Sequence, residues 1–232
     1  MTGEYFTFFI IKLTKAVSRR IKNLILSAYF WVAPDKYFVF KDKKYPYLRH
    51  IYNKAYENER TVEVPIIWEE IKKAKSKNVL EVGNVIRNYY PGTDHDVLDK
   101  YEKGEKIINE DINEFRADKK YDLIVSVSTM EHVGWDEKPR NPEKIISALK
   151  NIKENCLAKN GKFIFTIPLG YNRILDEFLR SKKLSFTEQY FLKRISSNNH
   201  WVEVEYDKVK EAIYGYPFPN ANAIMVGIED KE

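Results

Sequence analysis

The chain is short of the residues that build disulfide frameworks and metal sites. Cys156 is its one cysteine among 232 residues, so no internal disulfide can form and a multi-cysteine metal site is excluded. The four histidines are scattered and lack the HxxxH spacing that places two metal ligands on one helix face. We therefore expect neither a disulfide bond nor a bound metal.

The chain also lacks long apolar runs, and most of it lacks an excess of charge of one sign. No segment approaches the ~18 uninterrupted apolar residues of a membrane-spanning helix, and no small-residue cleavage site follows the first apolar run. The net charge of +5 is concentrated in residues 1–33, where five lysines and arginines stand against one glutamate. The rest of the chain is nearly neutral, unlike a general nucleic-acid-binding surface. We expect a cytoplasmic protein that does not bind nucleic acid.

The basic N-terminal segment has the pattern of an amphipathic helix. Apolar residues recur at the spacing of one helix face, and they are Phe6, Phe9, Ile10, Leu13, Val17, Ile21, Leu24, Ala28 and Trp31. Basic residues gather away from that face, and Pro34 ends the pattern. We predict a helix over residues 1–34, whose residues 5–32 suit an anionic membrane surface. The alternatives are packing on its own domain or on a second copy in a homodimer.

Residues 35–75 are predicted to form a cap or lead-in segment before the main domain. The first half predicts a short hairpin around Asp42–Lys43. The stretch Glu59–Pro65 is predicted to be extended, because a proline disfavours helix at the residue before it. Ile66–Lys75 is predicted to be a short amphipathic helix that leads into the first strand.

Regular strand signals then define a main domain over residues 76–232. Seven stretches have an apolar or β-branched centre, at residues 78–83, 95–100, 106–111, 121–128, 161–168, 200–206 and 222–229. A helical stretch over residues 142–158 ends before Asn160–Gly161, a common helix stop. Strands that alternate with helices predict an α/β fold, a Rossmann-like seven-stranded and mostly parallel sheet with helices on both faces.

The segment KNVLEVGNVI is the most informative part of the chain. Its apolar run ends at Glu81, whose carboxylate suits a ligand with hydroxyls or a positive charge, and the missing Cβ of Gly83 lets a ligand approach the backbone. Asp99 lies 18 residues after Glu81, where one carboxylate can accept from both hydroxyls of a ribose. Asp111 ends the third strand, where it could accept from an adenine amine while Ile112 covers the ring. A dinucleotide is disfavoured because GxGxxG is absent.

Three features together resemble the class I S-adenosylmethionine-dependent methyltransferases. They are VLEVG, the acids at the next two strand ends, and YDLIVSVSTMEHVG followed by GKFIFTIPLG, over residues 60–230. The EHV segment is similar to the type 11 and 12 small-molecule branch. The resemblance implies S-adenosyl-L-methionine as the cofactor, with Gly83 facing its methionine part and Asp99 its ribose. It further implies that Asp111 faces the adenine and that Ser128 lies near the sulfonium.

The glycine loop departs from the family pattern. The family commonly has a second and third glycine, whereas this chain continues with Asn84, Val85 and Ile86. Asn84 tolerates a left-handed turn better than most residues, and we count it among the predicted cofactor-binding residues. The β-branched Val85 and Ile86 do not tolerate such a turn, so the loop must take a different path.

The residues after the fourth and fifth strands are the candidates for catalysis and substrate binding. His132 is the predicted general base, because an imidazole exchanges protons near neutral pH. Glu131 is an alternative base, or a partner that fixes the imidazole tautomer. Tyr171 and Asn172 in the loop PLGYNR are predicted to bind substrate by stacking and hydrogen bonds.

Two sequence observations argue against a nucleic-acid acceptor. The [DN]PP[YF] motif of nucleic-acid amino-methylating enzymes does not follow the fourth strand, and Cys156 lies too far along the chain for a cytosine C5 nucleophile. We predict O- or N-methylation of a small-molecule, glycan or lipid-linked acceptor. The missing glycines favour an alternative, a non-catalytic relative that serves as a binding or scaffolding subunit. A further alternative is a methyltransferase-like fold that binds a different nucleoside.

Overall fold

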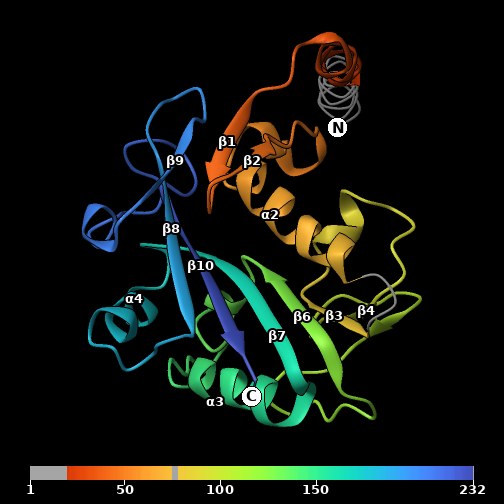
Figure 1. Cartoon of the computed structure of the whole chain (residues 1–232), viewed down its shortest axis with the longest axis vertical. Coiled ribbons are helices and arrows are strands. Elements are labelled where there is room, and N and C mark those ends of the chain that lie inside the picture. Colours follow the sequence, from red (N-terminus) through yellow and green to blue (C-terminus); the bar gives the residue numbers. More distant parts are fainter. Residues whose placement is uncertain (1–19, 75–77, 232) are drawn as a thin grey trace, which may run out of the picture.

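One eight-stranded sheet organises the described part of the chain, which comprises residues 20–74 and 78–231 of this computed structural model (Figure 1). The strand order is β5-β4-β3-β6-β7-β10-β8-β9. The strands are Val79–Val82 (β3), Asp96–Leu98 (β4), Ile107–Ile108 (β5), Tyr121–Val127 (β6), Leu157–Pro168 (β7), Glu188–Arg194 (β8), Trp201–Val204 (β9) and Ala223–Asp230 (β10).

The pairing of the strands confirms the predicted Rossmann-like fold class. Strands β3 to β7 pair in parallel, whereas β10 is antiparallel to both β7 and β8. The parallel part starts at its centre with β3 and extends to both sides, as in doubly wound sheets. The predicted number of seven strands was wrong, because β8 makes the sheet eight-stranded. Four of the seven residues in its sequence EQYFLKR are charged or carry an amide, which hid the strand.

Helices cover both faces of this sheet (Figure 1). They are α2 (Arg60–Lys73), α3 (Lys144–Asn151) and α4 (Arg173–Arg180), with short turns at η1 (Tyr52–Glu57), η2 (Ile86–Asn88), η3 (Met130–His132), η4 (Ile152–Cys156) and η5 (Tyr206–Lys208). Alternate side chains of β6 point to opposite faces. Ile124 belongs to the core beneath α3 and α4, while Leu123 and Val125 belong to the core beneath α2.

The helix α2 corrects the prediction that Glu59–Pro65 is extended. The helix includes Pro65 and continues to Lys73. A proline has no N–H, so the carbonyl of Thr61, four residues earlier, loses its usual helical donor. The backbone N–H of Leu48 donates to that carbonyl instead, at 2.9 Å. A tertiary hydrogen bond therefore replaces the missing helical one.

The lead-in segment packs on the sheet through the same core. Strands β1 (Tyr37–Phe40) and β2 (Lys43–Pro46) form the predicted hairpin around a turn at Lys41 and Asp42, both with positive φ. Aromatic side chains of the hairpin are buried with the apolar face of α2 against β6, β7 and β10. The segment therefore shares one apolar core with the main sheet.

The predicted helix over residues 142–158 ends earlier than expected. The α-helix stops at Asn151, a wider turn follows, and β7 begins at Leu157. Asn160 and Gly161 lie inside β7, where its register against β6 shifts. The pair that we predicted as a helix stop is therefore part of a bulged strand.

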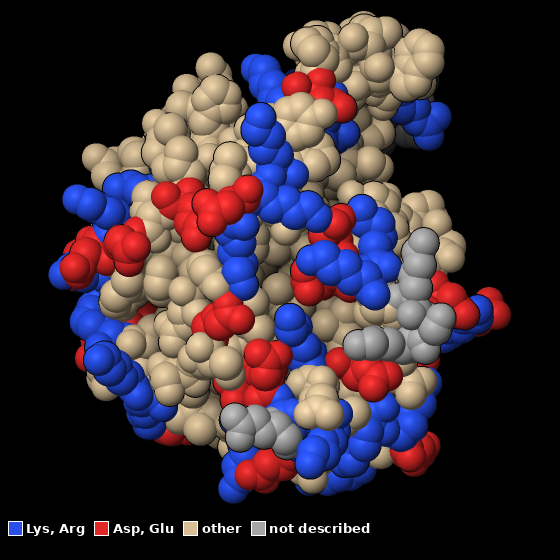
Figure 2. Space-filling model, in the orientation of Figure 1, with Lys and Arg blue, Asp and Glu red and all other residues tan. Residues whose placement is uncertain are grey.

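Residues 20–32 are helical, whereas the predicted helix positions from Phe6 to Val17 lie outside the described residues. Apolar side chains along this helix are exposed, namely Ile21, Leu24, Ile25, Tyr29, Trp31 and Val32. Figure 2 shows a largely uncharged surface at the top of the molecule, where this helix lies. Arg49 holds its end by donating to the carbonyl of Ala33 and pairing with Asp35. Among the described helices, none has the length and apolar character needed to cross a membrane.

Candidate functional site

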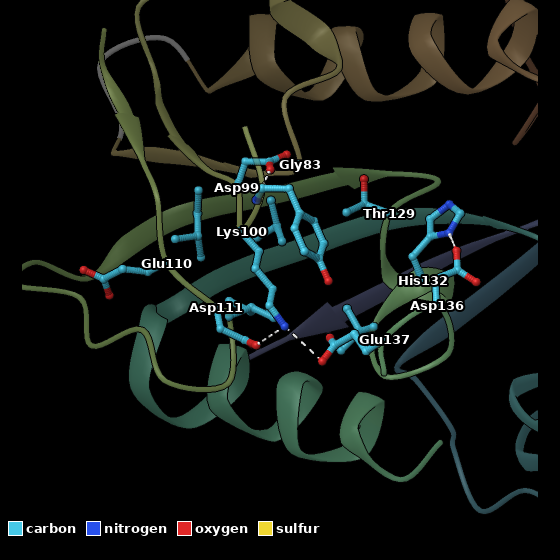
Figure 3. Close-up of a pocket in the computed structure, with 14 residues that line it drawn as sticks. Gly83, Asp99, Lys100, Glu110, Asp111, Thr129, His132, Asp136 and Glu137 are labelled. Carbon is cyan, nitrogen blue, oxygen red and sulfur yellow. Dashed lines mark hydrogen bonds and ion pairs between the residues drawn. The ribbon is translucent and has the colours of Figure 1, made fainter. Parts of the chain in front are cut away.

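A cavity of about 320 Å³ lies at the carboxyl ends of β3, β4, β5 and β6 (Figure 3). Ligands of parallel α/β sheets bind at this edge. Five predicted site residues line the cavity, namely Gly83, Asp99, Asp111, Ile112 and His132. The structure therefore brings together residues that the sequence spreads over fifty positions.

The turn after β3 requires glycine because another chain segment lies against it. Gly83 has φ +87°, and a Cβ there would lie 2.2 Å from the Oγ1 atom of Thr129. This contact joins the end of β3 to the loop that follows β6. A larger side chain at position 83 would strain the backbone and push that loop away.

Glu81 lies beneath this turn and does not line the cavity. Its side chain is fully buried, and its Oε1 atom accepts from the backbone N–H groups of Val85 at 2.8 Å and Ile86 at 2.6 Å. Its Oε2 atom is 2.8 Å from Nε2 of His95. The carboxylate thus fixes the path of a loop that lacks the family's further glycines. Asn84 also lies outside the cavity lining.

Asp99 borders the cavity at the end of β4 and is held by local backbone. Its Oδ1 atom accepts from the N–H groups of Tyr101 at 2.8 Å and Glu102 at 2.7 Å. Its Oδ2 atom accepts from the N–H of Asn84 at 3.3 Å. Because each carboxylate oxygen can accept more than one hydrogen bond, the Asp99 carboxylate can still accept from the two hydroxyls of a diol.

Asp111 belongs to an ion-pair network of two lysines and two carboxylates, which we call the balanced cluster. Nζ of Lys144 lies 2.5 Å from Asp111 and 2.6 Å from Glu137, and Nζ of Lys100 lies 2.9 Å from each carboxylate. Figure 3 shows Lys100 reaching along the cavity to these acids. Partial burial would raise the pKa of Asp111, but the hydrogen bonds from Lys144, Asn113 and Lys100 outweigh it and lower that pKa.

Aliphatic side chains form the remaining wall of the cavity. Val82 and Leu98 come from the ends of β3 and β4, while Ile112 and Val133 follow β5 and β6. Such a wall suits the flat face of a base, with polar groups confined to the rim.

His132 lies on the cavity rim and is oriented by a residue that the sequence analysis missed. Its Nδ1 atom is 2.5 Å from Oδ2 of Asp136, which also accepts from the hydroxyl of Tyr171 at 2.8 Å. Partial burial opposes these bonds, yet the contacts with His132 and Tyr171 lower the pKa of Asp136. Nε2 of His132 lies 3.5 Å from Oε1 of Glu131. The spacing of four residues between His132 and Asp136 could have signalled this pair.

Four further predicted residues lie beside the cavity without lining it. The buried Ser128 donates to Glu63 at 2.6 Å. Asn172 donates to the carbonyl of Glu131 at 2.8 Å and caps α4 by accepting from the N–H of Leu175. The ring of Tyr171 lies 4.9 Å from that of His132. Ser128 and Glu131 belong to the loop after β6, and Tyr171 and Asn172 contact that loop.

No family model and no curated protein matches the chain. Solved structures that resemble it include S-adenosylmethionine-dependent methyltransferases. The N-methyltransferase NodS from Bradyrhizobium japonicum, in complex with S-adenosyl-L-homocysteine, is 13% identical at a TM-score of 0.43, over 75% of this chain and 91% of its own. A possible histamine N-methyltransferase from Thermotoga maritima is 13% identical at 0.42, over 70% and 87%. Magnesium protoporphyrin IX methyltransferase from Synechocystis, with its cofactor bound, is 8% identical at 0.39, over 73% and 78%. The fold assignment itself rests on the strand order and register described above.

Proposed function

We propose that the protein is an S-adenosylmethionine-dependent methyltransferase that acts on a small-molecule, glycan or lipid-linked acceptor. The observation that carries the proposal is the cavity around which Gly83, Asp99 and Ile112 meet at the carboxyl edge of the sheet. This edge is where doubly wound folds bind nucleosides.

The lining residues fit an adenosyl group. The volume of about 320 Å³ and the wall that includes Leu98 and Ile112 suit a base. Asp99 is oriented by three backbone N–H groups and would hold the ribose hydroxyls. Gly83 lines the cavity and would face the methionine part. When bound, S-adenosylmethionine would supply a methyl group on a positively charged sulfur.

In this proposal the chain itself orients the acceptor and takes up its proton. The Asp136 carboxylate holds Nδ1 of His132, so that Nε2 is left to accept a proton at the rim of the cavity. Asp136 also binds the Tyr171 hydroxyl, which fixes a second side chain at the same place. The pair of His132 and Asp136 could take up the proton of either an oxygen or a nitrogen acceptor.

A second candidate function is a non-catalytic binding or scaffolding subunit. The balanced cluster favours it, because Asp111 already accepts from Lys100 and Lys144 and an adenine amine would have to compete with them. A protein of this kind would bind the cofactor weakly or not at all.

Calorimetric titration with S-adenosylhomocysteine separates the two candidates. We expect saturable binding to the wild type and a loss of about tenfold or more in Asp99→Ala, since a hydrogen bond to a charged group contributes about 1.5–3 kcal/mol. Asp207→Ala, which removes an exposed carboxylate outside the cavity, serves as the matched control. Unchanged affinity in Asp99→Ala would refute the ribose assignment, and no binding by the wild type would favour the non-catalytic candidate.

We further propose that helix 20–32 contacts an anionic membrane, which would bring a lipid-linked acceptor to the site. The exposed Leu24 and Trp31 would enter the interface, and Arg20 and Lys22 on the same helix would attract its charge. Leu24→Glu should reduce sedimentation with phosphatidylserine vesicles severalfold without changing the melting temperature. Equal sedimentation of variant and wild type would exclude this contact.

A further inference from the structure

A second polar group of residues lies between α2 and the loop after β6, and we call it the acidic cluster. It comprises Glu59, Glu63 and Glu131, which are 8%, 0% and 1% exposed, together with Arg60. Arg60 pairs with Oε2 of Glu63 at 2.8 Å, while Oε1 of Glu63 accepts from the Ser128 hydroxyl at 2.6 Å. One guanidinium therefore stands against three buried carboxyl groups.

Glu131 is the member of the acidic cluster with an unpartnered carboxyl oxygen, since only its Oε1 atom contacts another described side chain, that of His132. Its Oε2 atom is buried without a hydrogen-bond partner among the described residues, and so is the hydroxyl of Tyr89. Burial raises the pKa of Glu131, and the charge of Glu63 adds to that rise. A buried polar atom left unpaired costs about 1–3 kcal/mol. Such an atom suits a ligand that brings a donor and a positive charge.

Aromatic rings extend from His132, whose Nε2 atom lies 3.5 Å from the same carboxyl group. The rings of His132 and Tyr171 are 4.9 Å apart, and those of Tyr171 and Tyr214 are 5.3 Å apart. Burial raises the pKa of Tyr214 to about 12, and the charges of Glu59 and Glu131 contribute to this rise. Aromatic faces beside a carboxylate attract an ammonium group by cation–π interaction.

We propose that the acidic cluster is the acceptor site and that the acceptor is a cationic amine. Its ammonium group would donate to Oε2 of Glu131 and lie against the rings of Tyr171 and Tyr214. The inference rests on the proposed function and deepens it to N-methylation. An ammonium group would compensate the ionised form of Glu131, which burial disfavours, whereas a neutral alcohol could donate a hydrogen bond without compensating that charge.

The geometry beside Glu131 also provides a route for the proton that an ammonium must lose. Nε2 of His132 lies 3.5 Å from Oε1 of Glu131, and Asp136 holds the opposite ring nitrogen. The N–H bond of the ammonium breaks, its electron pair stays on the amine nitrogen, and the proton forms an N–H bond at Nε2. The free electron pair would then form the N–C bond to the methyl group, while the bond from that methyl group to sulfur would break with its electron pair left on the sulfur.

Isosteric probes test this site in the full-length protein. Calorimetric or NMR titration of the wild type is carried out with benzylamine and with benzyl alcohol, each with and without S-adenosylhomocysteine. We expect benzylamine to bind at least tenfold more tightly than the alcohol. Equal binding of the two probes, or no binding of either, would overturn the inference. If S-adenosylhomocysteine binds in the same samples, the proposed function survives that result.

A charge-removing variant tests the role of Glu131. Glu131→Gln should abolish the preference for benzylamine and leave the affinity for S-adenosylhomocysteine unchanged. Glu154→Gln, an exposed glutamate on η4, is the matched control and should keep the preference. A preference retained in Glu131→Gln would contradict the assignment. If that variant does not fold, Tyr214→Leu should lower amine affinity severalfold while Tyr214→Phe preserves it, and equal affinities of the two would count against the site.

Discussion

On one side of the loop that follows β6, two lysines face two carboxylates, and on the other side one arginine faces three. The balanced cluster around Asp111 and Glu137 neutralises itself and is partly open to solvent. The acidic cluster around Glu63 and Glu131 is buried and has three carboxyl groups for one guanidinium, and burial raises the pKa of Glu131. A buried charge without compensation costs several kcal/mol. The two clusters at the same sheet edge are therefore suited to ligands of different charge.

Removing the one cation of the acidic cluster should have the largest effect on stability. Arg60→Met leaves Glu63 buried without its ion-pair partner, and we expect the free energy of unfolding to fall by about 3–5 kcal/mol. Lys144→Met should cost much less, because Lys100 contacts the same two carboxylates. Urea unfolding of both variants measures the contrast.

The double variant Arg60→Met/Glu63→Gln is the control for this prediction. It removes the negative charge together with its partner, and the side-chain amide oxygen introduced by Glu63→Gln can still accept from the Ser128 hydroxyl. Most of the lost stability should return. Equal losses of unfolding free energy in Arg60→Met and Lys144→Met would contradict the inferred difference between the two clusters.

The glycine turn after β3 should give the next largest effect on stability. Gly83→Ala should lower the free energy of unfolding by about 2–3 kcal/mol, from the positive φ and the overlap with Thr129. Gly92 also has φ +87° but nothing lies within 4 Å of its Cβ position, so Gly92→Ala reports the backbone strain alone. Thermal unfolding of both variants separates the two contributions. A loss in Gly83→Ala no larger than in Gly92→Ala would mean that Thr129 moves aside freely.

A smaller, pH-dependent effect on the free energy of unfolding is expected from Asp176. Asp176 accepts from the N–H of Gly170 in the loop of Tyr171, and burial raises its pKa from 3.8 to about 6. The folded state then binds more protons than the unfolded state between roughly pH 4 and pH 6, so this group lowers stability as the pH rises through that range. Asp176→Asn should therefore be more stable than the wild type by about 1–2 kcal/mol near pH 8 and equal to it near pH 4. Unfolding curves at both pH values test this, and a pH-independent difference would disprove it.

The sequence predicted the fold class and five of the residues that line the cavity. Apolar strand centres and acids at strand ends located Asp99, Asp111 and His132, because a parallel sheet gathers its carboxyl ends at one edge. The helix through Pro65 was not predictable, since its stability depends on Leu48, which is close only in the folded chain. The acidic cluster was also missed. Glu63 belongs to a segment that we predicted to be extended, and only the fold brings it to Ser128.

The loop after β3 reaches its shape without further glycines because the carboxylate of Glu81 holds the N–H groups of Val85 and Ile86. A loop tied to a buried side chain has little conformational entropy to lose when a ligand arrives. Bulky residues can then occupy positions where a flexible loop needs glycine. Preorganisation by one internal acid would thus make the turn tolerant of sequence change at positions 84 to 86, while position 81 itself could not vary.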